Sequence, residues 1–290
     1  MRPLILVTGK NGQVGNELVK LSTEYPQFDF EFTDVAELDI TNADLVSNFF
    51  TKRKPVCCIN AAAYTVVDKA ETDQALALKI NAEAVGILAE NCAKVGAQFI
   101  HISTDYVYDG LATTPYLEDH EVSPVNFYGF SKLEGEKLAF EKLPSTVIIR
   151  TSWVYSFFGN NFVKTMLRLM SERDSLNVVG DQVGSPTYAA DLAAAIMQIV
   201  VQQQTTGQSF GGIYHYSNDG IISWFDFATE IKALGNKNCG VNAIPTSSYP
   251  TPAKRPAYSG MNKDKIASTF NIKIRDWKDS LKECIGLLEV

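Results

Sequence analysis

Tyr128 and Lys132 have the residue types and the spacing needed to move a proton to or from a carbonyl oxygen. They follow Pro124 in a segment that is predicted to be helical, so positions four apart share one face of the helix. A tyrosine has a pKa of about 10, too high for acid–base work near neutrality. A lysine ammonium nearby favours the phenolate, so we expect Lys132 to lower the pKa of Tyr128. Gly135 leaves room for another group to approach this face.

A second group of candidates follows the apolar run QFIHI at residues 98–102. Ser103, Thr104 and Asp105 come directly after this run, and Tyr106 and Tyr108 follow. A run of this length predicts a buried strand, so two hydroxyls and a carboxylate emerge at its tip. The sequence therefore predicts an active-site edge at residues 103–110.

A glycine loop lies between the first predicted strand, residues 4–8, and the first predicted helix. Its pattern is G-x-x-G-x-x-G. In such loops the first glycine permits the tight turn, the second lets the backbone approach a pyrophosphate, and the third lets helix and strand pack closely. The free N–H groups at the start of the helix favour an anion there. The loop predicts a dinucleotide site formed by Gly9, Gly12, Gln13, Val14 and Gly15.

Two residues give opposite indications about the cofactor. Asp34 follows the second predicted strand, where a carboxylate favours the ribose hydroxyls of NAD(H). Lys10, inside the glycine loop, is suited to the 2′-phosphate of NADP(H). Asp39 and Ile40 are expected to reach the adenosine, although their segment, LDIT, is also consistent with a helix N-cap at Thr41. The choice between NAD(H) and NADP(H) stays open.

Alternating strands and helices must position these groups. Continuous apolar runs separated by helical patterns predict βαβ units and a doubly wound parallel sheet, the Rossmann-type α/β class. We expect a dinucleotide-binding domain over residues 1–152 and a smaller α/β substrate domain over 153–290, with short strands near 176–180 and 212–217 possible returns to the first sheet. The strands are expected at 4–8, 28–32, 56–60, 98–102 and 146–150, and the helices at 43–53, 73–95, 161–172 and 189–203.

Composition excludes several classes of protein. The 290 residues carry a net charge of −7, which argues against a nucleic-acid or acidic-membrane surface. No stretch approaches the ~20 apolar residues of a membrane span, and the N-terminal apolar run is too short for a signal peptide. The five cysteines lack metal-ligand spacing, so we expect buried free thiols in a reducing, cytoplasmic compartment.

Four motifs together resemble those of the extended short-chain dehydrogenase/reductases: Gly9-x-x-Gly12-x-x-Gly15, Asn60-Ala-Ala-Ala, Ser103-Thr104-Asp105 and Tyr128-x-x-x-Lys132. Further segments, spread almost from end to end, resemble more narrowly the dTDP-4-dehydrorhamnose reductase family. They include NAAAYTVVDKAE, STDYVYDG, YGFSKLEGE, RTSWVY, DQVGSPT and PTPAKRP.

The resemblance implies NAD(P)H-dependent reduction of the 4-keto group of dTDP-4-dehydro-L-rhamnose to dTDP-L-rhamnose, for cell-surface polysaccharide synthesis. Tyr128 would donate the proton, Lys132 would hold the nicotinamide ribose, and Thr104 would hydrogen-bond the same oxygen. The implied cofactor-binding residues are Gly9, Gly12, Gln13, Val14, Gly15, Asp34, Asp39, Ile40, Ala63, Tyr64, Thr65, Ile102, Tyr128 and Lys132. The implied substrate-binding residues are Thr104, Asp105, Tyr128, Trp153, Asn161 and Arg255.

Several implied roles have alternatives. Trp153 would pack on the sugar, or else fill the core at the domain junction. Arg255 and Asn161 would reach the diphosphate, or Arg255 would instead close the proline-rich segment 245–260. Some family members bind Mg²⁺ at a dimer interface, which makes Glu17 and Asp191 metal candidates and a homodimer possible. Solvated helix positions are the favoured interpretation for both acidic residues, because hydride transfer does not need a metal.

Competing functions share this fold. A nucleotide-sugar dehydratase is disfavoured, because Tyr106 stands where the dehydratase pattern Thr-Asp-Glu has its glutamate base. An epimerase or another nucleotide-sugar reductase needs only the same Tyr/Lys pair. A non-catalytic NADP-binding regulatory subunit, like the beta subunit of methionine adenosyltransferase, can retain both residues. These two alternatives stay open.

Overall fold

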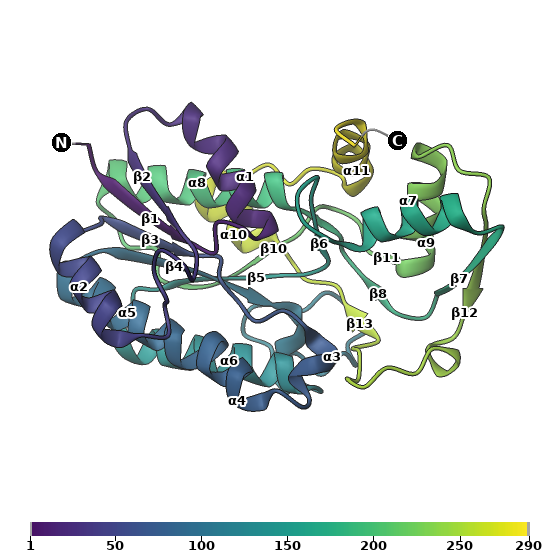
Figure 1. Cartoon of the computed structure of the whole chain (residues 1–290), viewed down its shortest axis with the longest axis horizontal. Helices are drawn as coiled ribbons and strands as arrows, with labels where there is room; N and C mark the ends of the chain where they lie inside the picture. Colours follow the sequence, from purple (N-terminus) through teal and green to yellow (C-terminus); the bar gives the residue numbers. More distant parts are fainter. Residues whose placement is uncertain (1, 289–290) are drawn as a thin grey trace.

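A six-stranded parallel sheet organises the larger part of the protein in the computed structural model, which describes residues 2–288 (Figure 1). The strand order is β2-β1-β3-β4-β5-β10, and neighbouring strands all run parallel. The predicted doubly wound α/β class is confirmed. The strands are β1 Leu4–Thr8, β2 Asp29–Thr33, β3 Cys57–Asn60, β4 Gln98–Thr104, β5 Val147–Thr151 and β10 Gly212–Tyr216.

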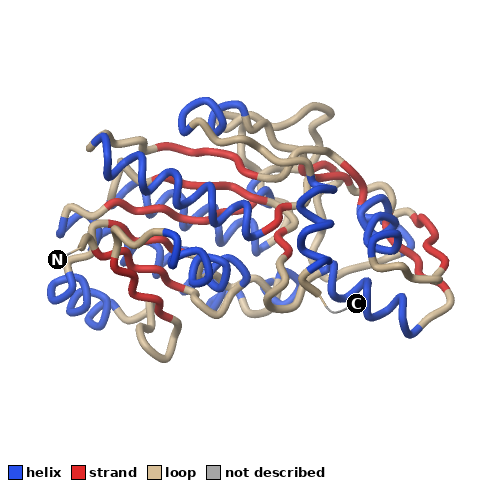
Figure 2. The backbone as a smooth tube through the Cα atoms, turned by 90° about the horizontal axis from the view of Figure 1, so that it is seen from above, coloured by secondary structure: helices blue, strands red, loops and turns tan. Residues whose placement is uncertain are grey.

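Helices cover both faces of this sheet (Figures 1 and 2). Ile5 and Val7 of β1 face a cluster that includes residues of α1 and α8, whereas Leu6 faces the other side, with α2 and α5. Because both faces are buried, the strands need continuous apolar runs. The helices are α1 Gln13–Leu21, α8 Ala189–Thr206 and α10 Asp264–Phe270 on one face, and α2 Ala43–Arg53, α5 Ala84–Val95 and α6 Phe127–Lys142 on the other.

The helix expected over residues 73–95 is interrupted. It divides into α4 Gln74–Leu78, a π-helical turn Lys79–Glu83, and α5, with the short α3 Val67–Ala70 preceding it. The π turn brings the backbone carbonyl of Asn81 so close to Gly135 that a β-carbon there would overlap it. The space expected at Gly135 is therefore filled by this turn, which locks α6 against the preceding helices.

A smaller unit holds three helices and several short strands, and its core includes Phe227 and Trp277. Its strand β7 pairs with β12 in a separate two-stranded sheet, so the expectation that the strand near 176–180 returns to the large sheet is wrong. Leu176 and Val178 instead pack into the core of the smaller unit. The elements are α7 Phe162–Glu172, α9 Trp224–Leu234, α11 Trp277–Gly286, β6 Val154–Tyr155, β7 Ser175–Val179, β8 Val183–Gly184, β9 Thr187–Tyr188, β11 Ile222–Ser223, β12 Gly240–Ile244 and β13 Tyr258–Ser259.

The segment after residue 153 also contributes to the larger unit. The strand expected near 212–217 is β10, which pairs with β5, and α8 packs against α1. All five cysteines are buried and unpaired. Among the described residues, no helix has both the length and the apolar character that crossing a membrane requires.

Candidate active site

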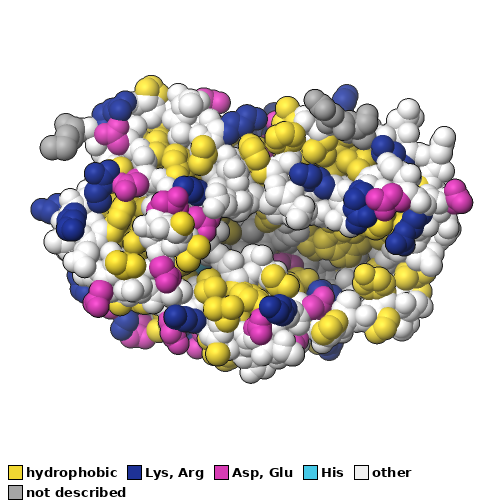
Figure 3. Space-filling model, viewed as in Figure 1, with side chains coloured by type: hydrophobic (Ala, Val, Ile, Leu, Met, Phe, Trp, Pro, Cys, Tyr) yellow, Lys and Arg dark blue, Asp and Glu magenta, His cyan; other side chains and the backbone are white. Residues whose placement is uncertain are grey.

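A cavity of about 690 Å³ opens at the carboxyl ends of the central strands, where the larger and smaller units meet. Figure 3 shows the molecule hollowed along this boundary. The strand order reverses between β1 and β3, and this is where open α/β sheets bind their ligands. The cavity brings together most of the predicted site residues: Gly9, Gly12, Gln13, Val14, Asp34, Asp39, Ile40, Ala63, Thr65, Ile102, Thr104, Asp105, Tyr128, Lys132 and Trp153.

The glycine loop supplies one wall of the cavity. Gly9 has φ +74°, and a β-carbon there would lie 2.6 Å from the backbone nitrogen of Ala62. A β-carbon on Gly15 would overlap the carbonyl oxygen of Gly9, so Gly15 serves the packing of the loop and does not line the cavity. Gly12 is the N-cap of α1 and makes no side-chain cap, so the first N–H groups of the helix are available to an anion.

Charged residues crowd the end of the cavity at β2. Asp34 accepts hydrogen bonds from the backbone nitrogens of Asn11 (3.2 Å) and Val35 (2.8 Å). Lys10 is paired with Glu37 at 2.6 Å, and this ammonium lowers the pKa of Glu37. A group that binds here therefore meets two carboxylates and a lysine whose charge is already balanced.

Asp39 is held in place by its neighbour. Its carboxylate accepts from the backbone nitrogen and the hydroxyl of Thr41, and these bonds lower the pKa of Asp39. The next helix is capped by Asn42, whose side chain accepts from two backbone nitrogens of the first turn. Thr41 is thus not the N-cap, and Asp39 and Ile40 line the cavity.

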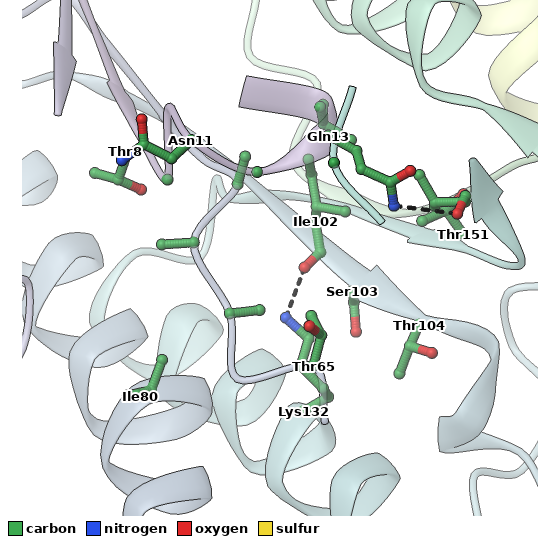
Figure 4. Close-up of a pocket in the computed structure, with 18 of the residues that line it drawn as sticks. Thr8, Asn11, Gln13, Thr65, Ile80, Ile102, Ser103, Thr104, Lys132 and Thr151 are labelled. Carbon is green, nitrogen blue, oxygen red and sulfur yellow. Dashed lines mark hydrogen bonds between the residues drawn. The ribbon is translucent and has the colours of Figure 1, made fainter. Parts of the chain in front are cut away.

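The other end of the cavity is formed by β4 and α6. Asn126 caps α6 by accepting from the backbone nitrogen of Gly129, which fixes the start of the helix that carries Tyr128 and Lys132. The buried amine of Lys132 donates to the carbonyl of Ile102 at 2.7 Å (Figure 4). The same amine lies 3.2 Å from Nε2 of His101. Burial lowers the pKa of Lys132 to about 8.

The pKa of Tyr128 moves in the direction opposite to the expected one. Burial and the negative charge of Asp105 raise it above 10, and the nearby hydroxyl of Thr104 offsets this only in part. The expected lowering by Lys132 is wrong, because the lysine amine is engaged by Ile102 and His101. Tyr128 is therefore protonated at neutral pH, the state that a proton donor needs.

Asp105 is a buried carboxylate beside Tyr128. Thr104 donates to it at 3.0 Å, and Ser259 of the smaller unit also stabilises its charge. Desolvation outweighs these bonds and raises the pKa of Asp105 to about 6. Tyr106 packs edge to face on Tyr128, with ring centroids 5.7 Å apart, so an aromatic ring occupies the place of the dehydratase glutamate.

Trp153 contributes to both the cavity and the core. Its indole stacks on Trp224 with centroids 3.5 Å apart, and both line the cavity. Its backbone has φ +47°, which is unfavourable for a large residue and requires support from the surroundings. A β-carbon on Gly184 would lie 2.9 Å from the indole, so Gly184 gives Trp153 its space.

Besides Gly15, three predicted residues lie outside the cavity lining. Tyr64 donates to Asp73 at 3.2 Å. Asn161 caps α7, accepting from Lys164, and donates to the side chain of Gln13 at 2.9 Å. Arg255 is bound to Asp68 at 3.0 Å and to the carbonyl of Ala253.

The two metal candidates, Glu17 and Asp191, are buried, whereas the alternative to metal binding assumed that they were solvated. Glu17 is buried and accepts from Ser156 at 2.6 Å, and burial raises its pKa. Asp191 is buried and paired with Arg275 at 2.7 Å, with further bonds from Asn218 and Ser280. Across residues 2–288 no three His, Cys, Asp or Glu side chains are grouped to hold a metal ion.

Sequence reasoning missed two polar residues behind the cavity. His101 of β4 is fully buried, and its Nε2 contacts the amine of Lys132. Asn81 joins the backbone of Tyr64 to the hydroxyl of Ser131 in α6. The signal for Asn81 was weak, because a π turn inside a helical pattern has no distinctive spacing. For His101 the signal was its place three residues before Thr104.

Comparisons with known proteins agree with this geometry. The family described as "RmlD substrate binding domain" matches residues 1–290. The dTDP-4-dehydrorhamnose reductase of Aggregatibacter actinomycetemcomitans is 43% identical, over 96% of this chain and 97% of its own length, and that of Escherichia coli K12 is 39% identical over 98% and 97%. The crystal structure of a dTDP-4-dehydrorhamnose reductase from Clostridium acetobutylicum superposes with TM-score 0.93 at 43% identity, covering 99% of this chain and 100% of that one. The Bacillus anthracis enzyme, in complex with NADP, gives TM-score 0.93 at 38% identity with the same coverage.

The sheet, the glycine loop and the Tyr128/Lys132 helix define an extended short-chain dehydrogenase/reductase. Within that class, the chain belongs to the dTDP-4-dehydrorhamnose reductase (RmlD) family. The family predicted from the sequence is confirmed. The predicted enzyme class, an NAD(P)-dependent oxidoreductase, and the predicted nicotinamide cofactor are confirmed as well.

Proposed function

We propose that this protein reduces the 4-keto group of dTDP-4-dehydro-L-rhamnose with NADPH or NADH, and that Tyr128 is the proton donor. The observation that carries the proposal is the single cavity in which the glycine loop, Thr104, Tyr128 and Lys132 meet. The reduced nicotinamide would supply the hydride to the sugar C4. Gly9, Gly12, Gln13, Val14, Asp34, Asp39, Ile40, Ala63, Thr65 and Ile102 would hold the cofactor.

The chain's own groups handle the proton. As the hydride arrives, negative charge develops on the carbonyl oxygen, and the phenol of Tyr128 donates its proton there. The hydroxyl of Thr104, which donates to Asp105 in the free protein, would turn to donate its hydrogen bond to the same oxygen and stabilise that charge. The raised pKa of Tyr128 keeps it protonated before the reaction, which suits reduction better than oxidation.

The smaller unit would hold the sugar nucleotide, so residues 153–290 are the proposed source of most substrate contacts. Trp153 and Trp224 present apolar surface on the far wall, which suits a deoxyhexose ring. Asp105, which lines the cavity, would bind sugar hydroxyls. Asn161 and Arg255 would act indirectly, because their side chains are engaged by Gln13 and Asp68.

The test is NAD(P)H absorbance with the purified protein and dTDP-4-dehydro-L-rhamnose, run with each cofactor. We expect one NAD(P)H oxidised for each dTDP-L-rhamnose formed. A folded protein that binds the cofactor but oxidises none would instead support the regulatory subunit. Isomerisation of a sugar nucleotide without net oxidation of NAD(P)H would support the epimerase.

A further inference from the structure

A chain of buried contacts leads from β3 to the amine of Lys132. Nδ2 of Asn60 lies 3.1 Å from Nδ1 of His101, and Nε2 of His101 lies 3.2 Å from Nζ of Lys132. All three side chains are buried, with exposures of 0%, 0% and 1%. Buried polar atoms must find their partners within the protein, so each contact in this chain needs one donor and one acceptor.

One backbone group sets the direction of the whole chain. The nitrogen of Ala62 lies 3.1 Å from Oδ1 of Asn60, and a backbone N–H can only donate. Asn60 therefore presents its oxygen to Ala62 and its NH₂ group to His101. The hydroxyl of Thr8, 2.7 Å from the same oxygen, donates as well. His101 must accept at Nδ1, which leaves its proton on Nε2, facing the lysine.

Lys132 must then accept a hydrogen bond from His101. An ammonium group has three donors and no acceptor, whereas a neutral amine has a lone pair. A neutral amine satisfies both contacts of Nζ, by accepting from Nε2 of His101 and donating to the carbonyl of Ile102 at 2.7 Å. An ammonium group would set an N–H of the lysine against the N–H of the imidazole.

We propose that Ala62, Asn60 and His101 form a tautomer lock that holds Lys132 as a neutral amine in the free protein. His101 is then a positioning residue, which acts on the reaction through Lys132. The relevance of the lock to catalysis rests on the proposed function, but the lock itself is a property of the free chain.

The charged groups around Lys132 are consistent with this state. Burial lowers the pKa of Lys132 to about 8, which favours the neutral amine but alone leaves most of it charged at pH 7, so the hydrogen bond from His101 must lower this pKa further. Burial also lowers the pKa of His101 well below its ordinary value, so the imidazole carries no charge of its own. Glu136, one turn along α6, raises the pKa of the lysine, but Arg150 of β5 binds this carboxylate with two nitrogens, at 2.6 and 3.0 Å. Tyr128, also on α6, is uncharged at neutral pH because its pKa is raised.

Nitrogen NMR of the free protein tests the lock directly. The two neutral tautomers of histidine have distinct ¹⁵N shifts, and the chain has three histidines, so ¹⁵N-histidine labelling gives a simple spectrum. Comparison with His101→Gln assigns the signal. We expect neutral His101 with its proton on Nε2 at pH 7. A proton on Nδ1, or an imidazolium, would overturn the proposal, and neither result depends on turnover.

Asn60→Asp reverses the lock with almost no change in shape. The introduced carboxylate still accepts from Ala62 but now also accepts from Nδ1 of His101, so Nε2 becomes an acceptor and Lys132 is held as an ammonium. We expect the His101 proton to move to Nδ1. We also expect the apparent pKa that reports the ionisation of Lys132 in the pH profile of kcat/KM to rise by about one unit or more. The control is Asn91→Asp, a buried asparagine that donates to Ile87 on α5, which should leave both unchanged. An unaltered tautomer in Asn60→Asp refutes the lock, and if that variant does not fold, the wild-type spectrum decides.

Discussion

The two ends of the cavity use charge in opposite ways. At the β2 end, Lys10 and Glu37 form an ion pair with side chains 28% and 45% exposed. At the β4/α6 end, Asp105 and Lys132 are 3% and 1% exposed, and burial moves both of their pKa values toward the uncharged state. Water screens charges at the β2 end, so substitutions there should alter the preference between NADPH and NADH only slightly. At the second end desolvation dominates, so substitutions should change turnover or stability strongly.

Tyr128→Phe gives the largest expected effect at the buried end. Loss of the proton donor should reduce kcat by about 10²- to 10⁴-fold, the usual contribution of a positioned general acid. Binding of NADPH, measured by fluorescence titration, should change little, because the ring and the helix remain. Tyr106→Phe is the matched control, since it removes a neighbouring hydroxyl from the same cavity. Near-normal turnover in Tyr128→Phe would show that another group donates the proton.

The α/β fold could be predicted because its signals are local. Apolar runs of strand length recur between helical patterns, and the glycine loop follows β1 directly. The partner of β7 could not be predicted, since an apolar run does not reveal which sheet it joins. The raised pKa of Tyr128 was also beyond the sequence: the spacing places Lys132 one turn away, but the capture of its amine by Ile102 and His101 depends on how β4 packs on α6. The contacts of Asn161 with Gln13 and of Arg255 with Asp68 could not be predicted for the same reason, because these partners are distant in sequence.

Asp105→Asn measures the cost of the buried carboxylate. The native pKa of Asp105 is about 6, above the ordinary 3.8, so the folded state holds this proton more tightly than the unfolded state. The protonated form of Asp105 therefore contributes its full stabilisation below about pH 4, and this stabilisation is lost as the pH rises through about 6. A shift of about two units corresponds to about 3 kcal/mol. Asparagine cannot ionise, so the variant should be more stable than wild type, and more so at pH 8 than at pH 5.

Urea unfolding at both pH values would measure this gain, with Asp109→Asn as the control. Tyr116 and the backbone of Leu111 lower the pKa of Asp109, so removing that charge should cost stability at pH 8 instead. An Asp105→Asn variant that is no more stable than wild type at pH 8 would mean that its charge is well solvated. Charges at the β4/α6 end of the cavity would then be as well solvated as those at the β2 end.

Arg255 and Asp68 are intermediate in exposure, and their expected effect is intermediate too. Their side chains are 20% and 41% exposed, and Asp68 also accepts from the backbone nitrogen of Ala253. If Arg255 acts by fastening the segment 245–260, Arg255→Ala and Asp68→Ala should raise the KM for the sugar nucleotide by similar factors, about two- to fivefold. The double variant should be little worse than either one. A much larger effect of Arg255→Ala alone would instead indicate direct contact with the diphosphate.

Glu37→Gln should give the smallest effect, and it addresses cofactor choice. Glutamine can still accept from the backbone nitrogen of Asp34, as Glu37 does at 2.9 Å, but it no longer balances the charge of Lys10. The released lysine favours the 2′-phosphate that distinguishes NADPH from NADH. We expect the ratio of kcat/KM for NADPH to that for NADH to rise only about twofold at low ionic strength, and less in high salt. Glu90→Gln, which breaks the exposed pair with Lys94 on α5, should leave the ratio unchanged. A ratio that does not move in Glu37→Gln would place the 2′-phosphate away from Lys10 and leave Asp34 as the determinant of cofactor choice.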